Sequence, residues 1–169
     1  IEAFRQRHVA EDAQDVPFYL MPVTINLVTE HAALAATISN SLGKNNPAVI
    51  VLDTLNRSFV GSESSDVDMT EYVKAADTLR ETFECAVIIV HHCGHDTSRP
   101  RGHTALVGAA DAVIGVRKES GDQFIATLEM MKDGPAGEKF AGRIEQVELG
   151  HDEDGELITS CVIAPVELT

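Results

Sequence analysis

Polar side chains follow three short apolar runs of the sequence, at the point where each run ends. They are Asp53 and Thr54, then His91 and His92, then Arg117 and Lys118. The runs are rich in Val and Ile and too short for typical helices, so each predicts a buried strand. If the strands are parallel, their carboxyl ends share the sheet edge at which α/β proteins bind ligands. We therefore expect an acid, imidazoles and cations to meet at one edge.

This set of groups suits a ligand that combines a metal ion with phosphate. The carboxylate of Asp53 can hold Mg²⁺, an imidazole can lie near a phosphoryl group, and cations can stabilise negative charge that develops there. A simpler interpretation makes Asp53 the start of a turn after an ordinary strand. The convergence of three such strand ends favours a site.

Helices are predicted between these strands. Apolar spacing and capping residues indicate helices over residues 1–10, 29–41, 70–83 and 103–109, with Thr29 capping the second and Asp68 or Thr70 the third. A short strand is expected at 18–21. The polar stretch 55–68 is long enough to be a functional loop, although its Glu63 and Asp66 are interpreted as solvated.

The end of the chain has a different character. Strands predicted over 124–131, 140–149 and 157–163 are separated by Gly-rich turns, which indicates an antiparallel ribbon. We expect one partial domain over residues 1–169, with a strand–helix core over 1–118 and the ribbon over 119–169. A chain that opens at Ile1 without methionine is interpreted as an excised piece of a longer protein.

The net charge, the number of cysteines and the length of the apolar runs limit the partners and the cellular location that we expect. A net charge of −14 argues against a surface that binds nucleic acid nonspecifically everywhere, but leaves room for a local basic channel. Three cysteines, an odd number without framework spacing, favour a reducing cytoplasm. No apolar run reaches membrane-spanning length, so no membrane partner is expected.

Four pieces of sequence, in order between Ala48 and about Leu149, carry a family resemblance. They are Val-Ile-Val-Leu-Asp53-Thr-Leu-Asn-Arg, Val-Ile-Ile-Val-His91-His92, the stretch from Arg101 to Asp111, and Met131-Lys132-Asp-Gly-Pro-Ala-Gly137. Together they resemble the RecA-type P-loop ATPases, nearest the RepA-like hexameric helicase and AAA ATPases of plasmids and phages. The resemblance implies an α/β, RecA-like three-layer core, with helices on both faces of parallel strands. It also implies a ring-forming motor that uses ATP and Mg²⁺ on nucleic acid, with DNA favoured over RNA.

The resemblance assigns roles to particular residues. Asp53 would be the Walker B residue, binding Mg²⁺ directly or through water, with Thr54 beside it at the nucleotide. His92, alone or with His91, would sense the γ-phosphate. Arg101 resembles an arginine finger that reaches the nucleotide of a neighbouring subunit. Lys132 matches a basic hairpin residue that approaches the γ-phosphate across the same interface.

The sequence also departs from the family pattern. No Gly-x-x-x-x-Gly-Lys-Ser/Thr phosphate loop occurs, since Gly43-Lys44 is followed by Asn45. The family's catalytic glutamate lies on a strand that would precede residue 1, and Met130 stands where many relatives carry a basic residue. The resemblance therefore implies the downstream part of an ATPase core, unable to hydrolyse ATP alone.

Two alternatives remain open. The cluster His91, His92, Cys93, His95 and His103 contains zinc-type ligands and, with Asp53, could form a metal-dependent hydrolase, although its spacing matches no standard zinc module. The chain could also be a non-catalytic, ATPase-like module for regulation or oligomerisation.

Overall fold

The computed structural model describes residues 1–9, 17–92 and 104–168. The chain divides into two compact units. The strand–helix unit contains Met21–Ala110, and the ribbon unit contains Ile1–Leu20 with Asp111–Thr169. The single partial domain, with its predicted division at residue 118, stays a prediction.

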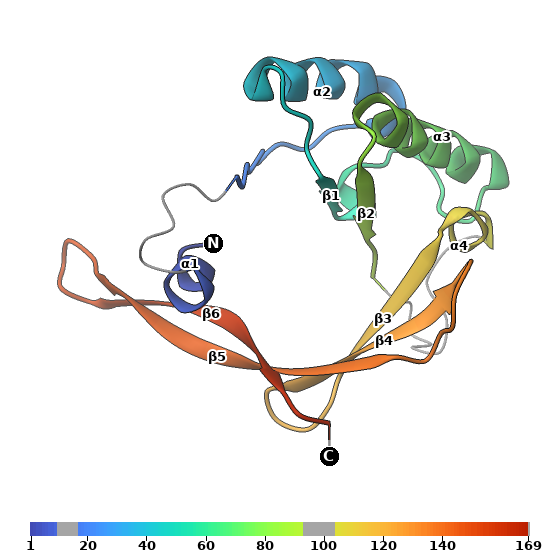
Figure 1. The fold of residues 1–169 in the computed structure, drawn as a ribbon. Helices are drawn as coiled ribbons and strands as arrows, with labels where there is room; N and C mark the ends of the chain where they lie inside the picture. Colours follow the sequence, from blue (N-terminus) through green and yellow to red (C-terminus); the bar gives the residue numbers. More distant parts are fainter. Residues whose placement is uncertain (10–16, 93–103, 169) are drawn as a thin grey trace. The chain divides into compact units, whose positions relative to one another are not determined.

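Two parallel strands lie at the centre of the strand–helix unit. β1 (Val49–Asp53) and β2 (Ala86–Val90) pair in register from Val49 with Ala86 to Asp53 with Val90. The other elements of this unit are α2 (Leu27–Leu42), the 3₁₀ helix η1 (Leu55–Arg57), α3 (Asp66–Phe83) and α4 (Thr104–Ala109). Figure 1 shows α2 and α3 beside one another above the two strands. Both strands were predicted from their apolar runs.

The core of this unit lies between the helices and one face of the strand pair. Ile50 and Leu52 of β1 are buried there, together with Tyr72 and Leu79 of α3 and Leu27 at the start of α2. The alternate residues of β1 are exposed instead. Because successive strand residues point to opposite faces, one face of the pair is covered and the other is not in the described part of the chain.

The helix ends agree with the sequence better than the helix starts do. α2 ends at Leu42, one residue beyond the expected end, and is followed by Gly43, whose φ of 63° favours glycine; α3 ends at Phe83, as expected. The predicted caps are wrong. α2 follows Asn26 because Leu27 is buried in the core, and α3 follows Ser65, whose Oγ accepts a hydrogen bond from Asp68 N.

The strand expected at 18–21 is not formed, because these residues have no strand partner in the part of the chain that is described. Phe18, Tyr19 and Leu20 are exposed. A short apolar run is consistent with a strand, but only a hydrogen-bonded neighbour makes it one.

The ribbon unit is an antiparallel sheet with the strand order β3-β4-β5-β6. Its strands are β3 (Ala112–Lys118), β4 (Gln123–Met131), β5 (Lys139–His151) and β6 (Leu157–Val166). Helix α1 (Glu2–His8) lies against this sheet: Arg7 forms a 3.3 Å ion pair with Glu145, and His8 Nε2 is 2.8 Å from the Ile163 carbonyl oxygen. The predicted antiparallel ribbon is confirmed.

One prediction about β3 is wrong. β3 was expected to be a third parallel strand that delivers Arg117 and Lys118 to the edge shared by Asp53 and the histidines. It pairs antiparallel with β4 instead, and in the described residues it makes no ladder with β1 or β2. The connection from Lys118 to Gln123 is short enough for a hairpin, where Glu119 N donates to Gln123 O at 2.8 Å.

The mixed α/β fold class predicted from the sequence is confirmed, with a parallel pair, packed helices and an antiparallel sheet. Among the described helices, none has both the length and the apolar character needed to cross a membrane.

Candidate nucleotide site at the end of the parallel strands

The ends of β1 and β2 bring Asp53 and the two histidines to the same edge. Asp53 pairs in register with Val90, so the strands end level, and His91 and His92 follow Val90 directly. Thr54 continues from Asp53 through a cis peptide bond and is partly buried. Of the three predicted groups, the acid and the imidazoles therefore meet, and the cations of β3 do not belong to this sheet.

Strand alternation separates the two histidines. Val49, Val51 and Asp53 of β1 occupy the uncovered face of the strand pair, and their register partners on β2 occupy it too. Continuing the alternation from β2 places His92 on this face and His91 on the covered face. Exposure agrees, because His92 is exposed whereas the side chain of His91 is only 12% exposed.

The His91 side chain lies beside an acid from the long polar loop. His91 Nε2 is 3.9 Å from Glu63 Oε2, and the Glu63 side chain is 23% exposed. The sequence interpretation of Glu63 as a solvated residue missed this contact. The available signal was the length and polarity of the 55–68 stretch, which indicated a functional loop without indicating which residue mattered.

The turn after Asp53 is anchored in the core. Leu55 is fully buried, and the Ser58 hydroxyl lies 3.0 Å from the Thr54 carbonyl oxygen and 2.8 Å from the Tyr72 hydroxyl of α3. Burial raises the pKa of Tyr72, while its hydrogen bond with Ser58 acts in the opposite direction. The segment that carries Asp53 is thus tied to α3.

Asp53 has the properties of a single carboxylate ligand for Mg²⁺. Its side chain is exposed at the strand end, and no hydrogen bond or ion pair with another described residue engages it. Mg²⁺ in nucleotide sites is commonly held by one or two carboxylates together with phosphates and waters, so one carboxylate suffices. The residues present fit that ion in the presence of a nucleotide.

A zinc-type site receives no support from the described residues, among which no group of three His, Cys, Asp or Glu side chains could hold a metal. Cys93, His95 and His103 of the sequence cluster lie outside the described residues.

Arg101 and Lys132 are the two remaining predicted site residues. Arg101 lies outside the described residues. Lys132 follows β4 in the ribbon unit, where its Nζ is 3.5 Å from Asp111 Oδ1 and its backbone N donates to the Asp111 carbonyl. Its side chain is 66% exposed, so the amino group remains accessible.

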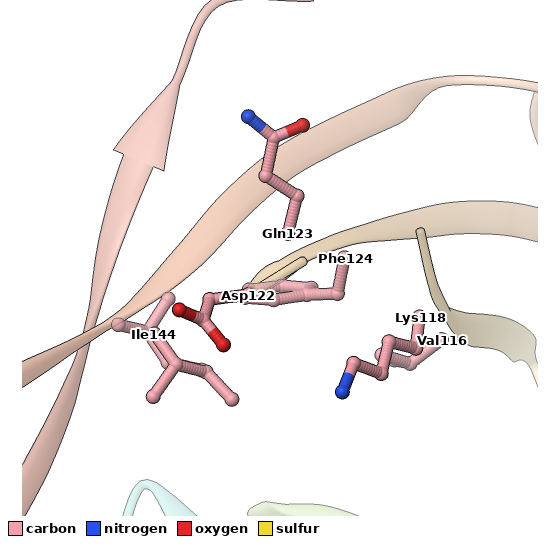
Figure 2. A pocket seen from close by; sticks show the side chains of 7 residues that line it. Val116, Lys118, Asp122, Gln123, Phe124 and Ile144 are labelled. Carbon is pink, nitrogen blue, oxygen red and sulfur yellow. The ribbon is translucent and has the colours of Figure 1, made fainter. Parts of the chain in front are cut away.

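The ribbon unit has a cavity of about 370 Å³, shown in Figure 2. Val116, Phe124, Ile144 and Ile163 form its apolar lining, and Lys118 and Asp122 add charges. Lys118, one of the cations expected at the strand ends, lines it, and Asp53, Thr54, His91, His92 and Lys132 do not. The cavity therefore adds nothing to the site at the end of β1 and β2.

The sequence matches the model of a known protein family. The family model described as an AAA domain matches residues 3–98, which contain β1, β2, Asp53, Glu63 and both histidines. Arg101 and Lys132 lie beyond the matched residues. A search of curated proteins found no match.

A crystal structure of the RadB recombinase is similar in fold, with a TM-score of 0.51 and 15% sequence identity. The similarity covers 69% of this chain and 56% of that chain, so this chain spans little more than half of the RadB length. At such low identity the likeness concerns the fold, which is RecA-like.

AAA and RecA-like proteins are generally ATPases that use ATP and Mg²⁺. The matched region covers more than half of the 169 residues and includes the strand end that carries Asp53. The chain therefore belongs to the AAA domain family and has a RecA-like fold.

Proposed function

We propose that this chain is the downstream part of the ATPase core of a nucleic-acid motor of the RepA-like replicative helicase type. The motor would act on DNA rather than RNA and would work as a homo-oligomeric, hexameric ring with nucleotide sites between subunits. A cytoplasmic location belongs to the proposal and is supported by free cysteines at Cys85 and Cys161.

One observation carries the proposal. Asp53 is exposed at the level ends of two parallel strands, in a domain of a family whose members are generally ATPases, and the alternation of β2 puts the exposed His92 on the same side. This is the edge at which α/β sheets bind their ligands. Asp53 would hold Mg²⁺ directly or through water, and Thr54 would lie beside the nucleotide.

His92 is the better placed of the two histidines for the γ-phosphate. It is exposed on the face of Asp53, whereas His91 lies on the covered face beside Glu63. An imidazole N–H can donate a hydrogen bond to a phosphoryl oxygen when the phosphate is present and lose it after hydrolysis. His92 would thus report the state of the nucleotide to the rest of the chain.

Arg101 and Lys132 would act on the nucleotide of a neighbouring subunit. A cation that approaches the γ-phosphate stabilises the charge that develops in the transition state. The exposed amino group of Lys132, paired only loosely with the exposed Asp111, is free to exchange that partner for a phosphate.

The 169 residues alone are proposed to be inactive. Hydrolysis needs backbone N–H groups and a lysine around the phosphates, and the sequence contains no phosphate-loop motif. Asp53 would then form half of a site that the rest of the full gene product completes.

The experiment compares Mg²⁺-dependent ATP hydrolysis by the full gene product and by its Asp53→Asn variant, with and without DNA. We expect DNA-stimulated hydrolysis in the wild type, and a loss of at least about 100-fold in the variant because the carboxylate charge on Mg²⁺ is removed. Asp77→Asn is the matched control, since Asp77 is exposed on α3 and pairs with Arg80. Absence of hydrolysis in the wild type would favour the non-catalytic module, and an unaffected Asp53→Asn would end the Walker B assignment.

A further inference from the structure

We infer that Glu63 is a positioning residue, which holds His91 on the covered face of the strand pair and thereby presents His92 to the nucleotide. The inference rests on the proposed function and adds to it a residue that does not touch the nucleotide. Its basis is the 3.9 Å approach of Glu63 Oε2 to His91 Nε2.

Both partners of this contact are largely withdrawn from solvent. The side chains of Glu63 and His91 are 23% and 12% exposed. A carboxylate withdrawn to this extent loses hydration, and the His91 imidazole is the polar group close to it, at a distance longer than a hydrogen bond. The contact is therefore less screened than the exposed ion pairs of α3.

Hydrogen bonds support the loop that carries Glu63. Ser62 N donates to Asp68 Oδ2 at 2.9 Å, and Ser65 N donates to the Ser62 carbonyl at 2.9 Å, so the residues on both sides of Glu63 are tied to the start of α3. At Gly61, a Cβ atom would come within 2.8 Å of the Phe59 ring and 3.0 Å of Asp68 Oδ2. The loop therefore packs closely against Phe59 and Asp68, and these contacts support the backbone on both sides of Glu63.

The consequence for His92 follows from chain geometry. His91 and His92 directly follow β2, and the side-chain alternation of β2, continued through them, sends consecutive side chains to opposite sides. Holding the His91 ring on the covered side therefore directs His92 to the side of Asp53. Without Glu63, the residues just after β2 would lose one restraint, and His92 would spend less time in its productive position.

A positioning role predicts a particular kinetic pattern. His92 acts on the transferred phosphate, so its misplacement lowers kcat, whereas the KM for ATP depends on other contacts and changes little. Since Glu63 and His91 act as one unit, removing both should cost no more than removing the more sensitive one.

The test uses the full gene product with the variants Glu63→Gln, His91→Gln and their combination, and Glu81→Gln as control. Glu81 is an exposed carboxylate on α3 that undergoes the same loss of charge. We expect kcat to fall about tenfold in each single variant and no further in the double variant, within the range of coupling between residues in contact. The KM for ATP, and the Kd for a non-hydrolysable ATP analogue with Mg²⁺, should change less than about twofold in the same variants.

The outcomes separate this inference from the proposed function. A wild type that does not hydrolyse ATP overturns both. A wild type that hydrolyses ATP, with Glu63→Gln as active as Glu81→Gln, overturns the positioning role alone. Losses that multiply in the double variant, or a weaker Kd for the analogue, also overturn it, because Glu63 would then act independently of His91 or on nucleotide binding.

Discussion

The hydroxyl group of Tyr72 lies 2.8 Å from the hydroxyl group of Ser58, in the core behind the turn that follows Asp53. Ser58 Oγ is also within hydrogen-bond distance of the carbonyl oxygens of Thr54 and Leu55. Carbonyl oxygens only accept and the serine has a single proton, so Tyr72 donates to Ser58 while Ser58 donates to the backbone. A side chain of α3 therefore fixes the segment that carries the candidate Mg²⁺ ligand.

The variant Tyr72→Phe removes the donor from this arrangement and is expected to lower the free energy of unfolding by about 1 kcal/mol. The effect is moderate because the Ser58 hydroxyl still donates to a backbone carbonyl oxygen. Only the hydrogen bond that Ser58 Oγ accepts from Tyr72 is lost. Urea unfolding at neutral pH measures it. Tyr19→Phe, a change at an exposed tyrosine, is the control and should be neutral. Equal stability of the two variants would show that the Tyr72 hydrogen bond contributes nothing.

The same tyrosine predicts how stability depends on alkaline pH. Burial raises the pKa of Tyr72 above its usual value of 10.0. Above pH 10 the unfolded chain therefore loses this proton before the folded chain does, and the free energy of unfolding falls as the pH rises further. Burial likewise raises the pKa of Cys85 above its usual value of 9.0. Cys85 therefore adds a further decrease in the free energy of unfolding, which begins at a lower pH than the decrease due to Tyr72. Unfolding curves between pH 8 and 11 should show a weaker decline above pH 10 in Tyr72→Phe, and an identical decline would contradict the assignment.

Leu55 provides a stronger test of the packing beneath the site. It follows Asp53 and Thr54 and is completely buried, so Leu55→Ala should lower the free energy of unfolding by about 2–5 kcal/mol through lost burial and a cavity. Val60→Ala removes a side chain that is 74% exposed and should change it by less than about 0.5 kcal/mol. Chemical denaturation of the two variants in parallel checks this contrast. Similar costs would mean that the turn is not packed as described.

The parts of the fold that sequence predicts are those with local causes. The runs that became β1 and β2 are apolar and β-branched, Gly43 ends α2 where a positive φ is required, and the Gly-rich turns produce the hairpins of the ribbon. β3 also has a strand pattern, but its pairing partner depends on the rest of the sheet. No property of residues 112–118 distinguishes a third parallel strand from the first strand of a ribbon.

In the candidate site, too, some features have local causes that sequence can predict and others depend on the tertiary structure. The meeting of Asp53 with His91 and His92 follows from parallel pairing of two strands that both end in polar residues, so sequence reasoning could reach it. The contact of Glu63 with His91 could not be predicted, because it depends on the path of a loop set by Ser62 and Asp68. Which histidine faces Asp53 likewise required the register and the covered face.

Gly142 is expected to be sensitive to the addition of a single methyl group. It lies opposite Phe124 in the pairing of β4 with β5, and a Cβ atom there would collide with the Phe124 ring and approach Ile163 Cγ2 at 3.2 Å. Figure 2 shows the Phe124 ring at the cavity of the ribbon unit. Gly142→Ala should therefore cost about 1–3 kcal/mol as the ring is displaced.

Gly108→Ala is the matched control for that variant. A Cβ atom at Gly108 meets nothing within 4 Å among the described residues, and the site is helical, so alanine should be neutral or stabilise by up to about 1 kcal/mol. Thermal unfolding should show a lower Tm for Gly142→Ala and an unchanged or higher Tm for Gly108→Ala. An unchanged stability of Gly142→Ala would indicate that the Phe124 ring can move away from residue 142 without a cost in free energy of unfolding.

The two free cysteines of the described residues should differ in reactivity. Cys85 precedes β2 and is 8% exposed, and burial raises the pKa of its thiol, which disfavours the reactive thiolate. Cys161 lies exposed on β6. Under native conditions at pH 8, iodoacetamide should modify Cys161 at least about tenfold faster, because Cys85 must wait for local opening of the core. Mass spectrometry of the two peptides follows both rates in one sample.

In 6 M guanidinium the rates should converge, since that condition removes the burial on which the difference depends. Equal native rates would place Cys85 at the surface and contradict the packing of β2 against α3.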